Sequence, residues 1–251
     1  MTPASQDRRV VAITGAGGAL GAAISGRLAG EAATDLVLSD VSGPSLAATV
    51  AQLPDARGAV ETAVADVGDL DQVTAVVDLA VERFGRLDVL ISNAGVLSPN
   101  GRIHNLATED WERAFRINVL GAVNGIRAAV PVMRAQASGS IVLTASVSGL
   151  TAWSHAAPYC TTKAAVIQLA KVAALEYARD GIRVNCVCPG TFRSAIHEEL
   201  PPEALDAIAA RHPLGLGAAG DLAGAYSYLA SRDSRWTTGA ALVVDGGYSA
   251  P

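Results

Sequence analysis

Apolar strand-like segments alternate with helix-like segments along almost the whole chain, and this alternation limits the fold more than any other feature. Seven segments are typical of strands: Val10–Thr14, Leu36–Leu38, Val60–Ala65, Leu87–Ile91, Ser140–Thr144, Ile182–Val187 and Ala241–Val244. The expected helices are Ala22–Ala33, Ser45–Leu53, Asp69–Phe84, Thr108–Ala137, Pro158–Arg179, Pro202–Arg211 and Asp221–Ser231. Alternating strands and helices build a parallel sheet covered on both faces. The sequence therefore predicts an α/β fold with a doubly wound, mostly parallel, seven-stranded sheet.

The composition allows one large folded unit. Half of the 251 residues are hydrophobic and 17% are charged, so the chain can bury a large core. No linker, internal repeat or low-complexity segment interrupts the alternation. We therefore expect one domain over residues 10–251, preceded by a flexible N-terminus at residues 1–9.

Charge and apolar patterning exclude several classes of partner. The net charge is −5 without a cluster of lysine and arginine, so we expect neither nucleic acid nor an anionic membrane as partner. No apolar stretch approaches the roughly 20 residues that span a bilayer, and Met1–Arg9 lacks the apolar region of a signal peptide. Cys186 and Cys188 lie too close along one strand to form a disulfide easily. We expect all three cysteines to be reduced thiols in a cytoplasmic protein.

Tyr159 and Lys163 are the first candidates for chemistry. They are four residues apart, so they lie about 40° apart on one helix face. A cation about 4 Å from a phenol favours the phenolate by roughly 3–4 kcal/mol, which lowers a pKa near 10 by about two to three units. The chain has 19 lysines and arginines, and Lys163 and Lys171 are its two lysines. This scarcity favours a functional pair, and the alternative is a helix with a chance tyrosine and lysine.

A glycine-rich turn, Thr14-Gly15-Ala16-Gly17-Gly18-Ala19-Leu20-Gly21, lies between the first strand and the first helix. Backbone N–H groups and the helix N-terminus can bind a pyrophosphate there, and glycine permits positive φ and a close approach. The stretch does not fit G-x-G-x-x-G, because Leu20 stands where the third glycine is required.

Asp40 ends the second strand and follows Gly21 by 19 residues (40 − 21). A carboxylate there can accept hydrogen bonds from both ribose hydroxyls of an adenosine and repels a 2′-phosphate. No lysine or arginine lies in the glycine turn or just after Asp40. We therefore expect NAD rather than NADP, and the alternative is a cap or loop aspartate.

Several short motifs occur in an order that resembles the short-chain dehydrogenase/reductase family, of the single-domain type of about this length. They are the glycine turn, Asp66-Val67, Asn93-Ala94-Gly95, Asn118, Ser146, Tyr159 with Lys163, Pro189-Gly190 and Asp245-Gly246-Gly247. The resemblance runs from Val10 to Gly247 and implies a Rossmann-type domain that interconverts an alcohol and a ketone with a nicotinamide cofactor. One departure is Ala19, where the usual TGxxxGxG loop has a glycine; the chain instead satisfies TGxxGxxG through Gly18.

The resemblance also implies roles for individual residues. Tyr159 is the acid–base group, Lys163 lowers its pKa, Ser146 holds the substrate oxygen, and Asn118 holds a water that links Lys163 to solvent. The implied cofactor-binding residues are Thr14, Gly15, Gly18, Ala19, Leu20, Gly21, Asp40, Asp66, Val67, Asn93, Ala94, Gly95, Tyr159, Lys163, Pro189, Gly190 and Ser194. Simpler readings remain for Asn118 as a locally bonded helix residue, Ser146 as a strand-end cap and Pro189-Gly190 as a turn. No metal site is expected.

The substrate site is expected between Ser146 and Tyr159 and under a lid at about residues 191–213. Trp153 and His155 stand where the family builds its substrate wall, together with Ser146 and Tyr159. The apolar side chains of the lid favour an apolar or cyclic secondary alcohol as substrate, and the alternative is that they only pack the lid. His155 is either a second acid–base group or a simple pocket or surface histidine.

Two other function classes share some of these features. A sugar-nucleotide epimerase or dehydratase would share Tyr159, Lys163 and the Gly18 spacing but normally needs a larger C-terminal region. The other class is a non-catalytic NAD-binding interaction protein, which often loses the Tyr, Lys or Ser. The resemblance further implies a homotetramer, or else a dimer, packed through the helices near Ala114–Met133 and after Tyr159.

Overall fold

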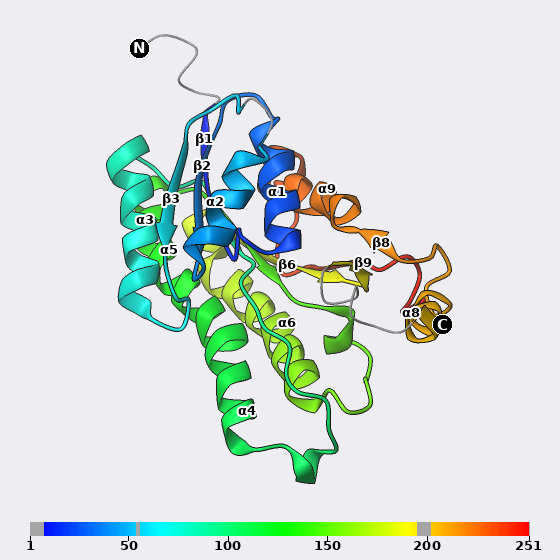
Figure 1. The fold of residues 1–251 in the computed structure, drawn as a ribbon. Helices are drawn as coiled ribbons and strands as arrows, with labels where there is room; N and C mark the ends of the chain where they lie inside the picture. Colours follow the sequence, from blue (N-terminus) through cyan, green and yellow to red (C-terminus); the bar gives the residue numbers. More distant parts are fainter. Residues whose placement is uncertain (1–7, 54–55, 195–201, 251) are drawn as a thin grey trace.

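The computed structural model describes residues 8–53, 56–194 and 202–250, and at its centre is a sheet of seven parallel strands (Figure 1). The strands are β1 (Arg9–Thr14), β2 (Thr34–Asp40), β3 (Val60–Val64), β4 (Val89–Ser92), β5 (Gly139–Thr144), β6 (Ile182–Pro189) and β9 (Ala241–Val244). Their order is β3-β2-β1-β4-β5-β6-β9, and every pairing is parallel. This confirms the predicted doubly wound fold, and the winding reverses between β1 and β4.

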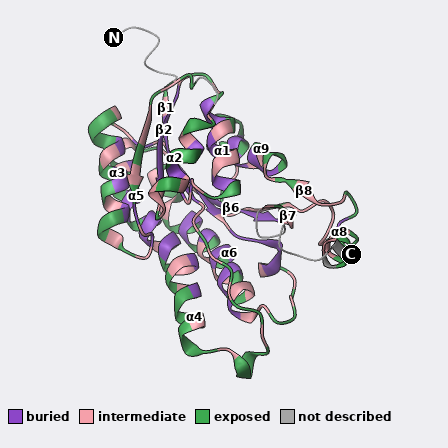
Figure 2. Ribbon diagram, in the orientation of Figure 1, coloured by how far each residue is buried: buried purple, intermediate pink, exposed green. Residues whose placement is uncertain are grey.

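Helices cover both faces of this sheet. One core contains α1 (Ala19–Ala29), α2 (Gly43–Ala51) and α9 (Ala219–Ala230), which pack on strand residues such as Val11 and Ile13. The other contains α3 (Leu70–Phe84), α5 (Gly121–Gln136) and α6 (Ala157–Tyr177), which pack on residues such as Val10 and Ala12. Alternate strand residues point to opposite faces of the sheet. Because helices cover both faces, the residues that point to either face are apolar. Figure 2 shows the buried strands between helices whose outer sides are exposed.

Strand β2 is longer than the expected Leu36–Leu38, because its polar ends are buried and bonded. The Asp35 carboxylate binds the guanidinium of Arg8 and accepts a 2.7 Å hydrogen bond from the backbone N–H of Ala59. The Ser39 hydroxyl donates to the Ile13 carbonyl. Polar residues that satisfy their hydrogen bonds can extend a buried strand, and an apolar pattern alone does not predict them.

Several predicted helix boundaries are wrong. Helix α1 begins at Ala19 rather than Ala22, because Gly18 is already its N-cap, and it ends at Ala29 rather than Ala33. The expected helix Thr108–Ala137 consists of α4 (Thr108–Ala114), a π-helical segment η3 (Phe115–Leu120) and α5. A π-helical turn inside a helix is frequent at functional sites, and η3 contains Asn118.

The first strand begins one residue earlier than predicted. Arg9 already belongs to β1, and its side chain pairs with Glu31, while Arg8 pairs with Asp35. Residues 1–7 lie outside the described residues.

The expected lid is described on both sides of residues 195–201. Before this gap, β7 (Phe192–Arg193) pairs with β8 (Gly217–Ala218) in a two-stranded ribbon that the sequence did not predict. After it, α8 (Pro202–Ala209) is two residues shorter than the expected helix. Figure 1 shows α8 beside the C-terminal end of the chain.

All three cysteines are free thiols, as the sequence predicts. Within the described residues, no helix combines the length and apolarity needed to cross a bilayer.

Candidate active site

The candidate residues gather at the carboxyl ends of β1, β2, β4, β5 and β6. Thr14, Asp40 and Ser92 end β1, β2 and β4, and Thr144 ends β5. The winding reversal between β1 and β4 opens a crevice at this edge in doubly wound sheets, and such folds bind their ligands there.

Two glycines allow the turn after β1 to pack closely. Gly15 has φ +66°, and a Cβ on it would lie 2.7 Å from Cα of Ala94. A Cβ on Gly21 would lie 2.1 Å from the Gly15 carbonyl oxygen. Real Cβ atoms do not approach so closely, so both positions require glycine for contact between chain segments.

The N-terminus of α1 can hold an anion. Gly18 and Ala19 are exposed there, Gly18 provides no side-chain cap, and the first turn contains no acidic residue. The first N–H groups of a helix have no partner within the helix and carry partial positive charge. These residues fit a pyrophosphate. Ala19 is an ordinary first helical residue, and the Leu20 side chain is buried, so only the Leu20 backbone can contact a ligand.

Asp40 joins the glycine turn to the segment after β2. Its Oδ2 accepts a 2.9 Å hydrogen bond from Gly17 N–H, and its Oδ1 accepts one of 2.9 Å from Ser42 N–H. The carboxylate is partly exposed, and no arginine or lysine pairs with it among the described residues. It therefore stands beside the glycine turn with free acceptor capacity.

Asp66 and Val67 lie after β3. Arg116 donates a 2.8 Å hydrogen bond to Asp66, and Gly68 N–H donates another, so the pKa of this carboxyl is lowered. The Val67 side chain is buried against Gly121, and its carbonyl accepts from Asn124. The structure thus gives both residues structural contacts at the sheet edge.

The Asn93-Ala94-Gly95 segment is bonded directly to the glycine turn. The Thr14 hydroxyl accepts hydrogen bonds of 3.1 and 3.2 Å from the N–H groups of Asn93 and Ala94. Asn93 Nδ2 donates to the carbonyls of Thr14 and Gly15. A Cβ on Gly95 would lie 3.3 Å from Lys163 Nζ, so this segment connects the turn with the Tyr159 helix.

Tyr159 and Lys163 face one another near the start of α6. Lys163 Nζ lies 5.7 Å from the Tyr159 ring centroid and donates a 2.8 Å hydrogen bond to the Thr144 carbonyl. Burial lowers the pKa of Lys163 from 10.5 to about 8. Burial raises the pKa of Tyr159, while its hydrogen bond with Ser146 acts in the opposite direction. In the protein without a ligand, the pKa of Tyr159 is therefore raised, whereas the sequence predicts that it is lowered.

Ser146 and Asn118 both lie beside this pair. Ser146 is buried, and its hydroxyl accepts a 3.1 Å hydrogen bond from Ser148 N–H. Asn118 Oδ1 accepts from Val96 N–H, and its Nδ2 donates to the Val96 carbonyl and to the Thr162 hydroxyl. The Asn118 side chain thus joins η3, α6 and the segment after β4 through partners 22 and 44 residues away, rather than bonding locally within its own helix.

Gly190 follows the end of β6 and packs on Asp245. A Cβ on Gly190 would lie 2.6 Å from Asp245 Cα, and its N–H donates to the Val244 carbonyl. Pro189 is buried in β6, and Ser194 is partly exposed at the start of the lid.

Trp153 and His155 differ in their surroundings. The Trp153 ring stacks on the Tyr159 ring at 6.2 Å between centroids. His155 is exposed with φ +67°, and its Nδ1 lies 2.9 Å from the Ser154 hydroxyl. Trp153 therefore contacts the candidate acid–base group, and His155 has the position of a surface histidine.

Sequence reasoning missed three residues that shape this site. Thr144 supplies the carbonyl that holds Lys163. Tyr248 contacts Trp153 at 6.3 Å, and His212 contacts Tyr248 at 4.8 Å between centroids. The available signals were that Thr144 ends a predicted strand and that Tyr248 directly follows the Asp245-Gly246-Gly247 motif.

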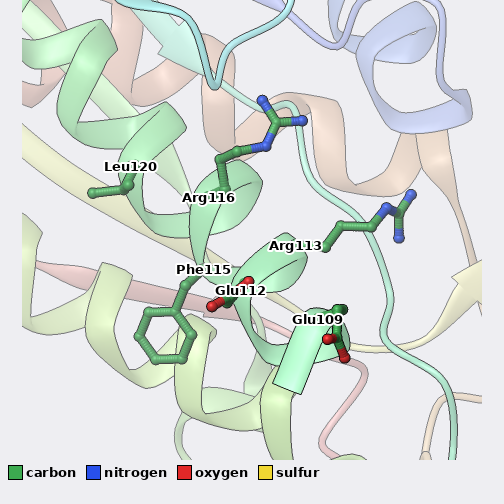
Figure 3. A pocket seen from close by; sticks show the side chains of 6 residues that line it. All are labelled: Glu109, Glu112, Arg113, Phe115, Arg116 and Leu120. Carbon is green, nitrogen blue, oxygen red and sulfur yellow. The ribbon is translucent and has the colours of Figure 1, made fainter. Parts of the chain in front are cut away.

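A separate depression of about 670 Å³ lies on α4 and η3 (Figure 3). Its lining residues are Glu109, Glu112, Arg113, Phe115, Arg116 and Leu120. It shares none of the predicted catalytic residues, although Arg116 also binds Asp66.

Comparisons with known proteins identify similar chains. A family model described as Enoyl-(Acyl carrier protein) reductase matches residues 15–249. The cis-4-hydroxycyclohexanecarboxylate dehydrogenase of Sinomonas cyclohexanicum is 38% identical over 244 residues, which are 96% of this chain and 97% of that protein.

Solved structures agree closely with the fold. NAD⁺-bound xylitol dehydrogenase has a TM-score of 0.89 at 30% identity and covers 95% of this chain and 98% of its own. ElxO with NADP bound has a TM-score of 0.89 at 28% identity, and the match covers 97% of this chain and 100% of the ElxO chain.

Proposed function

The chain belongs to the short-chain dehydrogenase/reductase family, and from this premise we propose that it is an NAD-dependent oxidoreductase that interconverts a secondary alcohol and a ketone. Members of this family use a nicotinamide cofactor. One observation carries the proposal: Tyr159, Lys163 and Ser146 converge at the sheet edge that also presents the glycine turn.

The chain's own residues account for the proton transfer. In the oxidative direction, Tyr159 as phenolate takes the proton of the substrate hydroxyl, and in reduction the phenol returns it. The Ser146 hydroxyl donates a hydrogen bond to the same oxygen as negative charge develops on it. When bound, the nicotinamide ring accepts or supplies the hydride.

Lys163 has an electrostatic role in this proposal. As a cation 5.7 Å from the centre of the Tyr159 ring, it favours the charged phenolate over the neutral phenol. This effect opposes burial, which raises the pKa of Tyr159. The Thr144 carbonyl accepts a hydrogen bond from the Lys163 ammonium group and so fixes its position.

The preference for NAD is proposed from Asp40. Its carboxylate lies beside the N-terminal turn of α1 and has no cationic partner among the residues described. A negative charge there repels a 2′-phosphate and accepts hydrogen bonds from ribose hydroxyls. Gly15, Gly18, Ala19, Gly21 and the Asn93-Ala94-Gly95 segment would form the remainder of the cofactor site.

A cyclic secondary alcohol is the proposed substrate class. Trp153 stacks on Tyr159 and provides an apolar wall beside the reacting oxygen, and the relative from Sinomonas cyclohexanicum acts on a hydroxycyclohexane compound. Free cysteines suit the cytoplasm, where we propose that the enzyme works.

A homotetramer, with a dimer as the alternative, is the proposed assembly. Leu120 of η3 and Val172 and Leu175 of α6 are exposed, the last by 83%. Exposed apolar residues on neighbouring helices are typical of subunit interfaces. Light scattering during size-exclusion chromatography measures the number of subunits.

Net NADH formation tests the proposed activity. The purified protein is incubated with NAD⁺ and a panel of cyclic and linear secondary alcohols, and absorbance is followed. A dehydrogenase accumulates NADH with at least one alcohol. An epimerase recycles the cofactor without net NADH formation, and a binding protein neither forms NADH nor recycles the cofactor. Absence of net NADH formation would therefore contradict the proposal.

A further inference from the structure

Four buried side-chain polar atoms of the described residues have no hydrogen-bond partner. They are Oγ of Ser98, Oγ of Ser148, Nε1 of Trp153 and the hydroxyl of Tyr248. Ser98 follows β4, Ser148 and Trp153 follow β5, and Tyr248 follows β9. All four therefore lie beyond the carboxyl ends of strands, on the side of the candidate active site.

Two of these atoms belong to aromatic rings in contact. The Trp153 and Tyr248 rings meet edge to face, with 6.3 Å between centroids and 76° between planes. Trp153 also stacks on Tyr159, with 6.2 Å between centroids. The indole thus connects the proposed acid–base group with Tyr248, and both unpartnered groups belong to this aromatic cluster.

The backbone that carries Tyr248 is held in place. The Asp245 carboxylate accepts hydrogen bonds of 2.9 Å from Gly247 N–H and 2.8 Å from Ser249 N–H. Gly247 has φ +90° and packs on Pro213. Tyr248 is therefore fixed by the turn on both of its sides.

The Tyr248 ring is held as well. The His212 ring lies 4.8 Å from it, and Arg211 Cζ lies 4.7 Å from its centroid. His212 is itself fixed, because its Nε2 accepts from Thr191 N–H and its Nδ1 lies 2.9 Å from the Ile208 carbonyl. A cation over an aromatic face is attracted to it, so Arg211 also helps to hold the Tyr248 ring.

An unpaired polar group in a buried site is unfavourable, and the great majority of such groups have partners. The indole N–H can only donate, and the phenol hydroxyl can donate. An acceptor oxygen supplied by a ligand would therefore satisfy either group. Neither the Asp245 carboxylate, which is bonded within its own turn, nor any other described side chain supplies one.

We propose that Trp153 Nε1 and the Tyr248 hydroxyl bind a second oxygen of the substrate. The preferred substrates are then cyclic secondary alcohols that carry a further hydroxyl, carbonyl or carboxylate oxygen. This inference rests on the proposed function, because it assigns the second anchor of the same substrate whose first oxygen contacts Tyr159 and Ser146.

The test compares cyclohexanol with cyclohexane-1,4-diol as substrates for the wild-type protein, Tyr248→Phe and the control Tyr228→Phe. Tyr228 is an exposed tyrosine on α9 whose hydroxyl lies 3.1 Å from Thr237 Oγ1. The wild type and Tyr228→Phe should prefer the diol beyond the statistical advantage of its two hydroxyls. Tyr248→Phe should lower kcat/KM for the diol about tenfold more than it lowers kcat/KM for cyclohexanol.

Two further measurements sharpen this test. Trp153→Phe removes the indole N–H and should reduce the preference for the diol in the same way. The melting temperature of Tyr248→Phe without ligands should not fall, because the removed hydroxyl has no protein partner. The comparison is then repeated with 4-hydroxycyclohexanecarboxylate, whose second oxygen is anionic. The size of the loss of kcat/KM in Tyr248→Phe, compared with the loss for the diol, shows whether an anionic or a neutral second oxygen is preferred.

The outcomes separate this inference from the proposed function. If both alcohols are oxidised without preference, or if Tyr248→Phe lowers kcat/KM equally for both, the second anchor is contradicted and the oxidoreductase remains. If no alcohol in the panel yields NADH, the proposed function is contradicted and the inference falls with it.

Discussion

Lys163 places its Nζ 5.7 Å from the centre of the Tyr159 ring, on the same face of α6. The ammonium group is buried, and the Thr144 carbonyl accepts its hydrogen bond at 2.8 Å. The helix spacing brings the two side chains together, and the end of β5 fixes the cation. The fold itself therefore places a buried lysine beside a phenol.

The burial of Lys163 predicts a pH-dependent stability. Its folded pKa is about 8, below the value of 10.5 expected for the unfolded chain. Between these values the unfolded state binds more protons, so stability rises with pH across this window. Relative to Lys163→Met, the wild type should gain up to about 3 kcal/mol from pH 8 to 10.5.

Urea unfolding of both proteins at several pH values measures this difference. Titrating groups that do not interact with Lys163 cancel, because they are common to both chains. A difference in unfolding free energy that stays constant or falls as pH rises through the window would mean that Lys163 is not buried as the structure describes.

Asp40 predicts the cofactor preference. We expect tighter binding of NADH than NADPH, a smaller difference in Asp40→Asn, and a reversed preference by about tenfold in Asp40→Arg. The Asn variant is the control, because it removes the charge and keeps one acceptor oxygen near Gly17. Energy transfer from tryptophan to the reduced nicotinamide measures binding. Tighter binding of NADPH by the wild type would refute the role of Asp40.

Gly21 and Gly26 form a matched pair on α1. A Cβ on Gly21 would collide with the Gly15 carbonyl, whereas a Cβ on Gly26 meets nothing within 4 Å. Gly21→Ala should lower stability by more than about 1 kcal/mol and weaken NADH binding. Gly26→Ala should raise stability by roughly 0.5–1 kcal/mol. Thermal unfolding tests both, and similar effects of the two substitutions would contradict the packing of the glycine turn.

The sequence predicted the sheet and its helices because apolar periodicity reports burial directly. It underestimated β2, where Thr34, Asp35 and Ser39 are buried through hydrogen bonds rather than through apolarity. It also treated Thr108–Ala137 as one regular helix, because residue spacing does not distinguish the π-helical turn at Phe115–Leu120 from α-helix.

The candidate site was predictable where its residues are local, as with Tyr159 and Lys163. It was not predictable where distant segments meet. Trp153 and Tyr248 are 95 residues apart (248 − 153), and their contact depends on how the chain returns after β9. The net rise in the Tyr159 pKa was also missed, because burial is a property of the folded chain.

The role of Tyr159 is the central claim, and the turnover of Tyr159→Phe tests it most directly. The substitution removes the hydroxyl and keeps the ring that stacks on Trp153. We expect kcat to fall by at least about 10²-fold, with NADH binding nearly unchanged and with normal activity in the control Tyr177→Phe at the far end of α6. Near-full activity of Tyr159→Phe would contradict the proposed mechanism.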